Sequence, residues 1–484
     1  MDVLIMAGIL ATTAILGLRD LGLHDLENDE ATSFFIAQLD WGPLWESLKT
    51  SEANGSPFYI SLHFWRTFGD SESTLRLLPW VFGILTPVLL YRLMKRLFGT
   101  GYGLAAGSLL CVNGFLLVHT QNLRSYSMSV FLATAATLLF VRWIEGAGLI
   151  DRIAYVVVGS LLVYAHFVGA LVIGAHFLSL LLLPKEKWRL RDFALTYLAM
   201  AVLVLPLAVF VLSGDVGQVD WINELTPKRL YGGLKLLGGF DSSLQLFGYA
   251  GLALLGLIGV FWHKRSTGEV WKRALLYLWL LLPVIGVVLI SLSKPLFQER
   301  YLLATLPAFT ACAVLGIATL RFKVLCIAAW IGLLVITASQ VPNLYEPGKE
   351  GKWAKGAEIM ATVGDSSDAL IFYAPTIIRP FGYYAGYYPG DTPSPVEPEV
   401  IYPTKDWLGF SKTRYTPSFK RILAEASTRD QVWLMTGAAD DATRRRELKA
   451  LVRKLTRLCG DIGEKYPEMA LTRFVQCDRG PPVK

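Results

Sequence analysis

The acidic cluster Glu27-Asn28-Asp29-Glu30 is the first group of residues in this sequence that could do chemistry. It follows an apolar N-terminal segment. A carboxylate near a membrane surface can take the proton of an acceptor hydroxyl as a general base, while a neighbouring carboxylate orients the groups around it. Asp29 and Glu30 are therefore candidate catalytic residues. The alternative is a solvated acidic loop without a chemical role.

Two arginines stand beside aromatic residues in segments that are far apart in the sequence. Arg124 precedes Tyr126 by two residues, and Arg300 lies between Glu299 and Tyr301. A guanidinium group offers a planar fork of N–H donors that suits phosphate oxygens. We expect the two arginines and the two tyrosines to bind a lipid phosphate, and Glu299 to bind substrate. Each arginine alone could instead be an anchor that reaches from a helix end to the membrane interface.

Two histidines are further candidates for substrate binding. His166 ends a long apolar segment, where ionisable residues are often functional, and His63 lies in a short apolar stretch of the first loop. A hydrogen-bonded structural histidine is the alternative. The histidine spacing matches no metal signature, and the sequence has no nucleotide-binding loop, nucleophile elbow or zinc-protease helix. We therefore expect neither a metal nor a cofactor.

The composition indicates that membrane helices position these residues. Of 484 residues, 53% are hydrophobic and 18% are charged, whereas about a quarter are charged in soluble proteins. Apolar runs long enough to span a bilayer recur up to about Val341, without the alternation of a barrel strand. The first run lacks the features of a cleaved signal peptide, so we expect it to be retained. We expect about eleven transmembrane helices, near residues 3–19, 77–95, 103–119, 126–144, 152–168, 169–184, 192–213, 244–263, 273–292, 300–319 and 322–341.

The charged residues predict the orientation of these spans. Every second connection is rich in Lys and Arg, which are typical of cytoplasmic loops. The first loop, residues 20–76, holds ten acids and three bases. We therefore expect a cytoplasmic N-terminus, an outer first loop, and a location in the inner or plasma membrane. The net charge of +7 follows from this topology, so no nucleic-acid partner is expected.

The first outer loop contains two apolar stretches that are too short to span a membrane. We expect Phe34–Leu48 and Pro57–Phe68 to be helices on the outer surface, and Gly42-Pro43 to split the first of them. Trp41 and Trp45 suit the membrane interface.

From about residue 343 the composition becomes that of a globular domain. The pattern predicts helices at 352–363, 418–426 and 441–458 and strands at 369–373, 431–435 and 471–477, which together indicate a small extracytoplasmic α/β domain. The chain therefore divides into a membrane domain, 1–342, and a C-terminal domain, 343–484. Cys459 and Cys477 are either free thiols or, in an oxidising compartment, a disulfide.

The ordered set of motifs resembles the GT-C glycosyltransferases. It is most similar to the dolichyl-phosphate-mannose protein mannosyltransferase-like group (glycosyltransferase family 39-like), which includes lipid A aminoarabinose transferases and lipopolysaccharide-core galacturonosyltransferases. The residues that carry the resemblance are Asp29-Glu30-Ala31, Pro57 through Trp65, Phe68 through Glu72, Leu75-Arg76-Leu77, Gln121 through Arg124, Tyr126, His166, and Glu299-Arg300-Tyr301-Leu302. Asn122 departs from the group, whose members usually have an acid there.

The resemblance implies that one sugar moves from a polyprenyl-phosphate carrier to a lipid, glycan or protein acceptor outside the cytoplasm, with inversion. It assigns the acceptor proton to Asp29 and the donor phosphate to Arg124 and Arg300. Three alternatives remain open at this point. They are a transporter or flippase for lipid-linked glycans, a ligase for whole oligosaccharides, and an inactive assembly partner.

Overall fold

The computed structural model describes residues 1–146, 148–212, 222–262, 266–345, 353–373, 377–386, 399–402, 419–437, 442–459, 461–467 and 470–477. The chain packs as two compact units. The helical unit comprises Met1–Gly22 and Leu48–Glu346, and the sheet unit comprises Leu23–Ser47 and Pro347–Lys484. This division differs from the predicted domain boundary at residue 342, because Leu23–Ser47 of the first outer loop packs with the C-terminal part of the chain.

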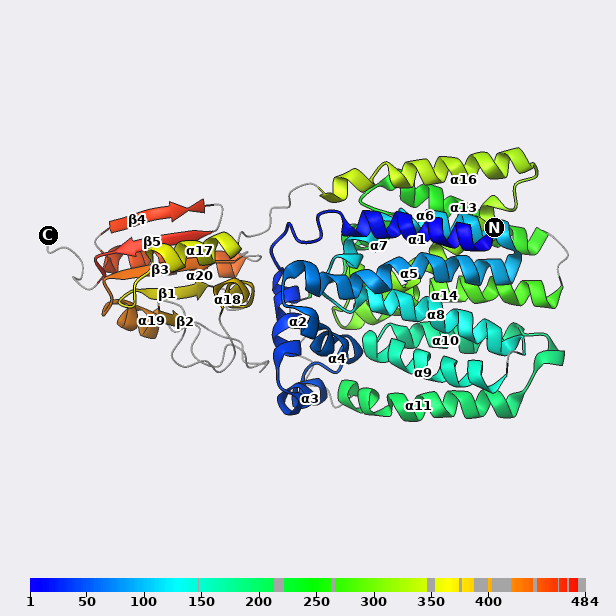
Figure 1. Ribbon diagram of the computed structural model, residues 1–484, viewed down its shortest axis with the longest axis horizontal. Coiled ribbons are helices and arrows are strands. Elements are labelled where there is room, and N and C mark those ends of the chain that lie inside the picture. Colours follow the sequence, from blue (N-terminus) through cyan, green and yellow to red (C-terminus); the bar gives the residue numbers. More distant parts are fainter. Residues whose placement is uncertain are drawn as a thin grey trace. The chain divides into compact units, whose positions relative to one another are not determined.

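The helical unit has a helix at each of the eleven places where the sequence predicts a span, and these helices lie side by side (Figure 1). Its α-helices are α1 (Asp2–Leu18), α4 (Ser56–Trp65), α5 (Glu72–Phe98), α6 (Thr100–Cys111), α7 (Gly114–Thr120), α8 (Tyr126–Ile144), α9 (Leu149–Ala165), α10 (Gly169–Ser179), α11 (Leu190–Leu212), α12 (Pro227–Leu237), α13 (Ser243–Trp262), α14 (Thr267–Ser293), α15 (Leu306–Ile317) and α16 (Lys323–Ala338). Its short 3₁₀ helices are η1 (Arg66–Phe68), η2 (Leu180–Leu182), η3 (Lys185–Lys187), η5 (Glu299–Thr305) and η6 (Val341–Tyr345).

Among the described residues, seven helices are long and apolar enough to cross a membrane, and the bent pair α6 and α7 would make an eighth. The helix α1 and the α10–η2 segment are apolar but shorter. The chain is therefore a multi-pass membrane protein, and the expected number of about eleven spans includes segments that fall below these criteria.

The predicted span at 103–119 is broken. Asn113 lies between α6 and α7, and its side-chain oxygen accepts a hydrogen bond from Leu116 N at 3.2 Å, which caps the start of α7. The two helices meet at an angle of 60°. An asparagine within an apolar run thus starts a new helix, which a hydropathy pattern does not show.

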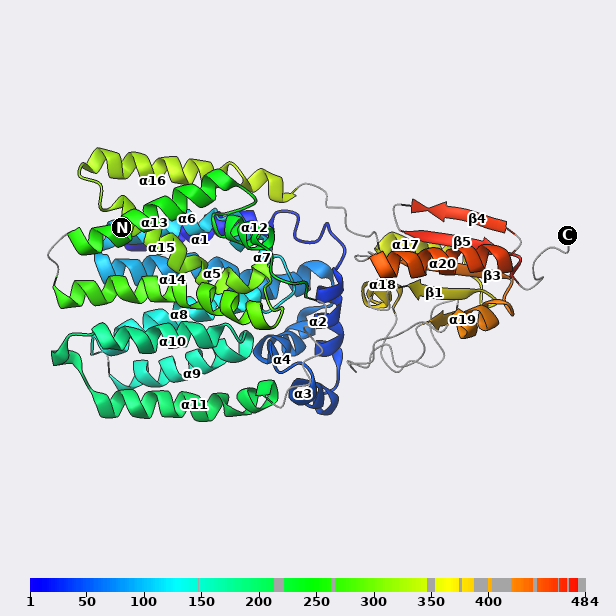
Figure 2. The same ribbon diagram turned by 180° about the vertical axis from the view of Figure 1, so that it is seen from behind.

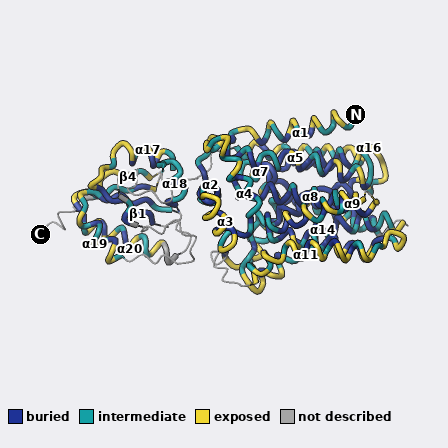
Figure 3. The backbone as a smooth tube through the Cα atoms, turned by 60° about the horizontal axis from the view of Figure 1, so that its bottom comes forward, coloured by how far each residue is buried: buried dark blue, intermediate teal, exposed yellow. Residues whose placement is uncertain are grey.

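The spans differ strongly in how far the protein itself covers them. The segment formed by η5 and α15 is 89% buried inside the protein, whereas α11 and α16 are each 17% buried (Figure 3). Leucines and valines cover the exposed faces of α11 and α16, as expected for surfaces that contact lipid. The η5–α15 segment therefore lies in the core of the helical unit.

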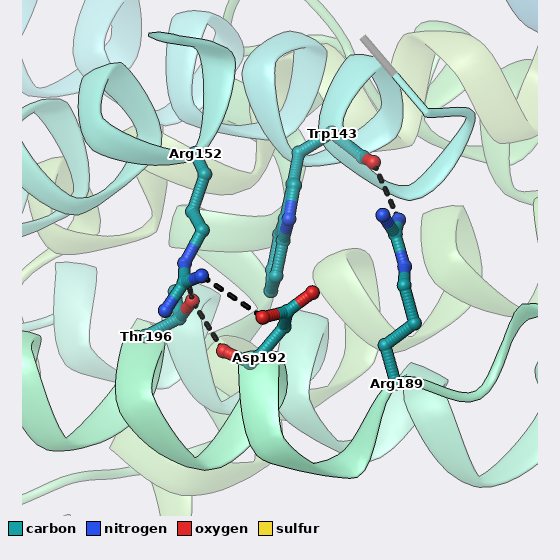
Figure 4. Close-up of polar contacts among 5 residues, drawn as sticks. All are labelled: Trp143, Arg152, Arg189, Asp192 and Thr196. Atoms are coloured by element: carbon teal, nitrogen blue, oxygen red, sulfur yellow. Dashed lines mark hydrogen bonds and ion pairs between the residues drawn. The ribbon is translucent and has the colours of Figure 1, made fainter. Parts of the chain in front are cut away.

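Polar contacts tie α8, α9 and α11 together at the ends opposite to Arg124 and His166. Arg152 pairs with Asp192 at 3.0 Å and donates to Thr196 at 2.9 Å, while Arg189 donates to the carbonyl of Trp143 at 2.9 Å (Figure 4). Arg152 lies in the first turn of α9 and Arg189 directly before α11, at the helix ends that the sequence predicts to be cytoplasmic. They therefore help to fix how the three helices pack.

The part of the first outer loop that was expected to form one split surface helix forms two helices, of which the first is buried from Glu30 to Ala37. They are α2 (Asn28–Gln38) and α3 (Trp41–Thr50), and the boundary between the two units falls within α3. The break comes at Leu39–Asp40, earlier than the expected Gly42-Pro43. Pro43 sits in the first turn of α3, where a missing N–H costs little.

The sheet unit contains a five-stranded sheet with strand order β2-β1-β3-β5-β4. Pairing is parallel from β2 through β3 and antiparallel from β3 through β4. The strands are β1 (Ala369–Tyr373), β2 (Glu399–Tyr402), β3 (Gln431–Thr436), β4 (Asp461–Tyr466) and β5 (Leu471–Val475). The helices are α2, α17 (Trp353–Val363), α18 (Ile378–Ala385), α19 (Phe419–Ala426) and α20 (Ala442–Leu458).

Helices cover both faces of this sheet. Side chains alternate along β1, so that Ile371 packs with α19 and α20 while Leu370 and Phe372 pack with α17 and α18. The predicted elements of the C-terminal domain are present, and Cys459 and Cys477 form a disulfide. The sequence did not predict α18, β2 or β4. The sequence around Tyr387, Tyr388 and Pro389 has neither helical nor strand periodicity, and these residues lie outside the described ones.

Candidate active site

Arg124 lies in a tight connection between α7 and α8. Gln121 begins this connection, and its side-chain amide donates to the carbonyls of Gly17 and Arg19 at 3.1 and 2.6 Å. These carbonyls lie at the end of α1, where backbone oxygens lack partners within the helix. The next turn is closed by a bond from Arg124 N to Asn122 O at 2.7 Å. The connection is thus fixed to the first helix.

The side chain of Arg124 is held by a residue that the sequence did not single out. Its Nη1 donates to the hydroxyl of Tyr59 on α4 at 3.2 Å, and that hydroxyl donates to Glu52 at 3.2 Å. Burial raises the pKa of Tyr59 well above its usual value. Its hydroxyl therefore stays neutral, so that it can accept from Arg124 and donate to Glu52. The first outer loop therefore orients Arg124.

Arg300 is placed by η5, which packs against α12. Figure 2 shows α12 beside α7. Arg229 on α12 donates to Phe297 O at 3.1 Å, just before η5. Gly233 allows α12 to come close, since a Cβ atom there would lie 2.8 Å from Phe297 and 3.2 Å from Glu299. The sequence did not predict α12, although Thr226-Pro227 is a typical helix start; the Thr226 side chain accepts from Arg229 N.

His166 lies at the break between α9 and α10. Its Nδ1 accepts a hydrogen bond from Val168 N at 3.3 Å, which turns the chain into α10. The same break is tied to the first outer loop, because Asn54 Oδ1 accepts from Phe167 N at 3.1 Å and Gly55 N donates to Tyr164 O at 2.7 Å. The loop between α3 and α4 therefore fixes the position of His166 as well as that of Arg124.

The aromatic rings bring the two arginine segments to one place. The guanidinium of Arg300 lies 5.5 Å from the ring centre of Tyr126, which itself lies 6.1 Å from the ring of His166. The ring of His166 contacts that of Tyr301 at 4.7 Å. Arg124 belongs to the same connection as Tyr126 and precedes it by two residues. The structure thus joins Arg124, Tyr126, His166, Arg300 and Tyr301, which we call the arginine cluster.

The arginine cluster combines two positive charges with aromatic surface. Tyr126 and His166 are buried, whereas both arginines and Tyr301 are only half-buried and present their surface at the ends of α8 and α9. Guanidinium groups that are partly withdrawn from water bind phosphate oxygens more strongly than exposed ones. This arrangement can hold an anionic phosphate and stabilise charge that develops on it.

The two remaining residues predicted for substrate binding occupy different places. Glu299 begins η5 next to Arg300 and faces Gly233 of α12. His63 lies on α4, where its ring contacts that of Phe64 at 5.4 Å. From α4 it is Tyr59, one turn earlier, that reaches the arginine cluster.

The predicted catalytic carboxylates lie on α2, in the sheet unit. Asp29 is half-buried in the first turn. Glu30 is 2% exposed, and its Oε2 accepts from Glu27 N at 3.0 Å while Glu27 accepts from the backbone of Glu30. This reciprocal pair is a capping box. It gives Glu30 a structural part in starting the helix that presents Asp29.

Among the described residues, no group of three or more His, Cys, Asp or Glu side chains is placed to hold a metal ion.

The comparisons with known proteins agree with this architecture. Residues 56–213 match the family described as dolichyl-phosphate-mannose-protein mannosyltransferase. The fold is similar to that of ArnT from Cupriavidus metallidurans in the apo state, with a TM-score of 0.61 and 12% sequence identity over 99% of each chain. The same relative bound to undecaprenyl phosphate matches with a TM-score of 0.61 and 12% identity over 97% of each chain. No curated protein matches the sequence.

The family match begins at the start of α4 and ends in α11, so it includes Tyr59, Arg124 and His166. The structural match extends over almost the whole chain, including the sheet unit. The chain is thus a polytopic membrane protein that shares the fold of ArnT, and its residues 56–213 are similar to the dolichyl-phosphate-mannose-protein mannosyltransferase family.

Proposed function

We propose that this protein is a glycosyltransferase that moves a single sugar from a polyprenyl-phosphate carrier to an acceptor on the outer side of the membrane, with inversion at the anomeric carbon. The observation that carries the proposal is the arginine cluster, in which the guanidinium of Arg300 lies over the ring of Tyr126 and Arg124 precedes that tyrosine by two residues. The similar ArnT fold with undecaprenyl phosphate supports a lipid-phosphate ligand.

The proposed chemistry uses few groups. Asp29 takes the proton of the acceptor hydroxyl, whose oxygen then forms a bond to the anomeric carbon. The bond from that carbon to the carrier phosphate breaks, and its electron pair leaves with the phosphate. Because this leaving group is a stable anion, no general acid is required. Arg124 and Arg300 stabilise the charge that develops on it.

The sidedness of the reaction follows from the charge pattern. We propose that Arg92, Arg142 and Arg189 face the cytoplasm and that Asp29, Arg124 and the sheet unit face outward. The disulfide in the sheet unit supports this orientation, because such bonds persist in oxidising compartments.

The test is transfer of a labelled sugar from a polyprenyl-phosphate donor in membranes that contain the full chain. Asp29→Asn should reduce transfer to a residual rate that is measurable only at high enzyme concentration, without changing the amount of folded protein. Asp40→Asn is a matched control, because Asp40 is exposed at the start of α3 and Asn caps helices equally well. Full activity of Asp29→Asn would overturn the assignment of the base.

The product also separates the alternatives. A single-sugar transferase adds the mass of one sugar to the acceptor, whereas a ligase adds that of a whole oligosaccharide. A flippase moves lipid-linked glycan across vesicle membranes without forming a new glycosidic bond. Mass spectrometry of envelope glycolipids and glycans, with and without this protein, would identify the sugar and the acceptor.

A further inference from the structure

The residues just before Asp29 are held by hydrogen bonds to the C-terminal part of the chain. Asp25 Oδ2 accepts a hydrogen bond from Ala354 N at 3.0 Å, in the first turn of α17. The next residue, Leu26, donates its backbone N–H to the hydroxyl of Tyr384 on α18 at 2.8 Å. Leu26 is fully buried, so this bond replaces water that its N–H would otherwise need.

The same segment is held after Asp29 as well. Arg379 Nη1 on α18 donates to the hydroxyl of Thr32 at 3.0 Å. The Thr32 hydroxyl donates in turn to Asn28 O at 2.7 Å. The hydroxyl therefore uses its one donor and one of its acceptor sites. One turn further along α2, the ring of Phe34 packs edge-on against Tyr383 at 4.9 Å.

These contacts act on a helix start that is already rigid. The Glu27–Glu30 capping box fixes the backbone on either side of Asp29. The bond through Thr32 ends on the carbonyl of Asn28, directly before Asp29. The helix α18 is itself anchored in the sheet core by Ile378 and Phe381. A chain of contacts therefore runs from the sheet core to the peptide that carries the carboxylate.

We propose that the C-terminal domain is a positioning device for the catalytic carboxylate, with Arg379 and Tyr384 as positioning residues for Asp29. This inference rests on the proposed function, since it takes Asp29 to be the general base. A base must lie within hydrogen-bonding distance of the proton that it takes. A displacement of about 1 Å from distant substitutions can lower a rate by about 100-fold.

The inference gives the C-terminal domain a role in catalysis. It also explains why Leu23–Ser47 packs as part of the sheet unit. The loop and the domain are separated by more than three hundred residues of sequence, yet they fold as one body. Removal of the domain should therefore impair catalysis, and not merely the binding of a partner.

The experiment compares Arg379→Gln, Arg379→Lys and Tyr384→Phe in the full-length protein. Arg379→Gln and Tyr384→Phe each remove a contact to the segment that carries Asp29 and keep most of the side-chain volume. We expect kcat to fall by about 10- to 100-fold in both variants. The KM for the donor should change by less than about twofold, because the arginines proposed to bind it belong to the helical unit. Arg379→Lys keeps one donor for Thr32 and should recover most of kcat.

Matched controls come from the same unit. Arg421→Gln removes an exposed arginine that pairs with Glu425 on its own helix, and Tyr466→Phe removes a hydroxyl that donates to Glu464. Both controls should leave kcat unchanged. Formation of the Cys459–Cys477 disulfide, measured by thiol labelling, reports whether the sheet unit is folded in every variant.

A double mutant distinguishes positioning from a general loss of structure. If Arg379 acts through Asp29, Asp29→Asn combined with Arg379→Gln should be no slower than Asp29→Asn alone. Additive losses would overturn the inference. Normal kcat in both Arg379→Gln and Tyr384→Phe would also overturn it, while an inactive Asp29→Asn would leave the proposed function standing. An active Asp29→Asn would instead refute the proposed function.

Discussion

Arg124 and Arg300 come from distant segments that meet at the ring of Tyr126, and this is the residue-scale feature on which the proposed function depends. Neither side chain is explained by topology, because the positive-inside pattern does not place arginines at these helix ends. The structure gives each a defined orientation, Arg124 by Tyr59 and Arg300 by the face of Tyr126. Their arrangement suits a phosphate group.

The first prediction concerns donor binding. Arg124→Gln and Arg300→Gln should each raise the KM for the polyprenyl-phosphate donor by roughly 10-fold, because each removes a charge-assisted hydrogen bond worth about 1.5–3 kcal/mol. Arg66→Gln is a suitable control, since Arg66 pairs with Asp70 on the surface. Initial rates over a range of donor concentrations measure the effect. Equal donor KM values in all variants would argue against a phosphate site here.

The second prediction separates the two carboxylates on α2. Glu30→Gln should keep nearly full activity, because an amide oxygen can still accept from Glu27 N in the capping box. Glu30→Ala should lower stability by about 1 kcal/mol, as loss of a cap does. Thermal unfolding and transfer rates measure both changes. If Glu30→Gln were as inactive as Asp29→Asn, Glu30 would have a chemical role.

At the scale of elements, close helix packing places the core segment. The helices α13 and α15 approach through Gly256 and Gly316, so that a Cβ atom on Gly316 would lie 1.7 Å from Leu252 O. Small residues permit such approaches between membrane helices. This packing supports α15 directly after η5, which carries Arg300 and Tyr301.

The third prediction tests that packing. Gly316→Ala should destabilise the protein by about 1–3 kcal/mol, because the helices must move apart to admit the methyl group. Gly251→Ala on α13 is the matched control, since nothing lies within 4 Å of a Cβ atom there. The melting temperature in detergent measures the difference. Equal melting temperatures for the two variants would contradict the close approach.

At the scale of the whole molecule, the chain builds one compact unit from two distant parts. The sheet unit takes Leu23–Ser47 from the first outer loop and combines it with the C-terminal part. Its covalent link, Cys459–Cys477, joins the residue after α20 to the second residue after β5. The stability of this unit therefore bears on the helix that carries Asp29.

The fourth prediction concerns this disulfide. Cys459→Ser combined with Cys477→Ser should lower the stability of the sheet unit by roughly 3 kcal/mol, the value expected for a loop of this size. Transfer activity should be lost at a lower temperature than in the unchanged protein. Limited proteolysis across a temperature series would follow the sheet unit. An unchanged profile would show that the bond adds nothing to its stability.

The sequence by itself determined the class of protein and the places of the helices, and it predicted residues that the structure brings together. Hydropathy and charge are local signals, and a helix in lipid satisfies its own backbone, so each span could be recognised without its neighbours. Arg124, Tyr126, His166, Arg300 and Tyr301 were recognisable from residue type and a family resemblance. The break at Asn113 and the helix α12 were missed because capping and amphipathic surfaces give weaker signals.

Only the tertiary structure decided which side chains complete the site and what holds it. Tyr59 and Arg229 act through single hydrogen bonds to residues far away in the sequence, and no local pattern encodes such a partner. The same holds for the contacts from Arg379 to Thr32 on α2 and from Tyr384 to Leu26, which precedes α2. These contacts depend on chain segments that meet only after folding, because their energy comes from burial and geometry that no short stretch of sequence contains.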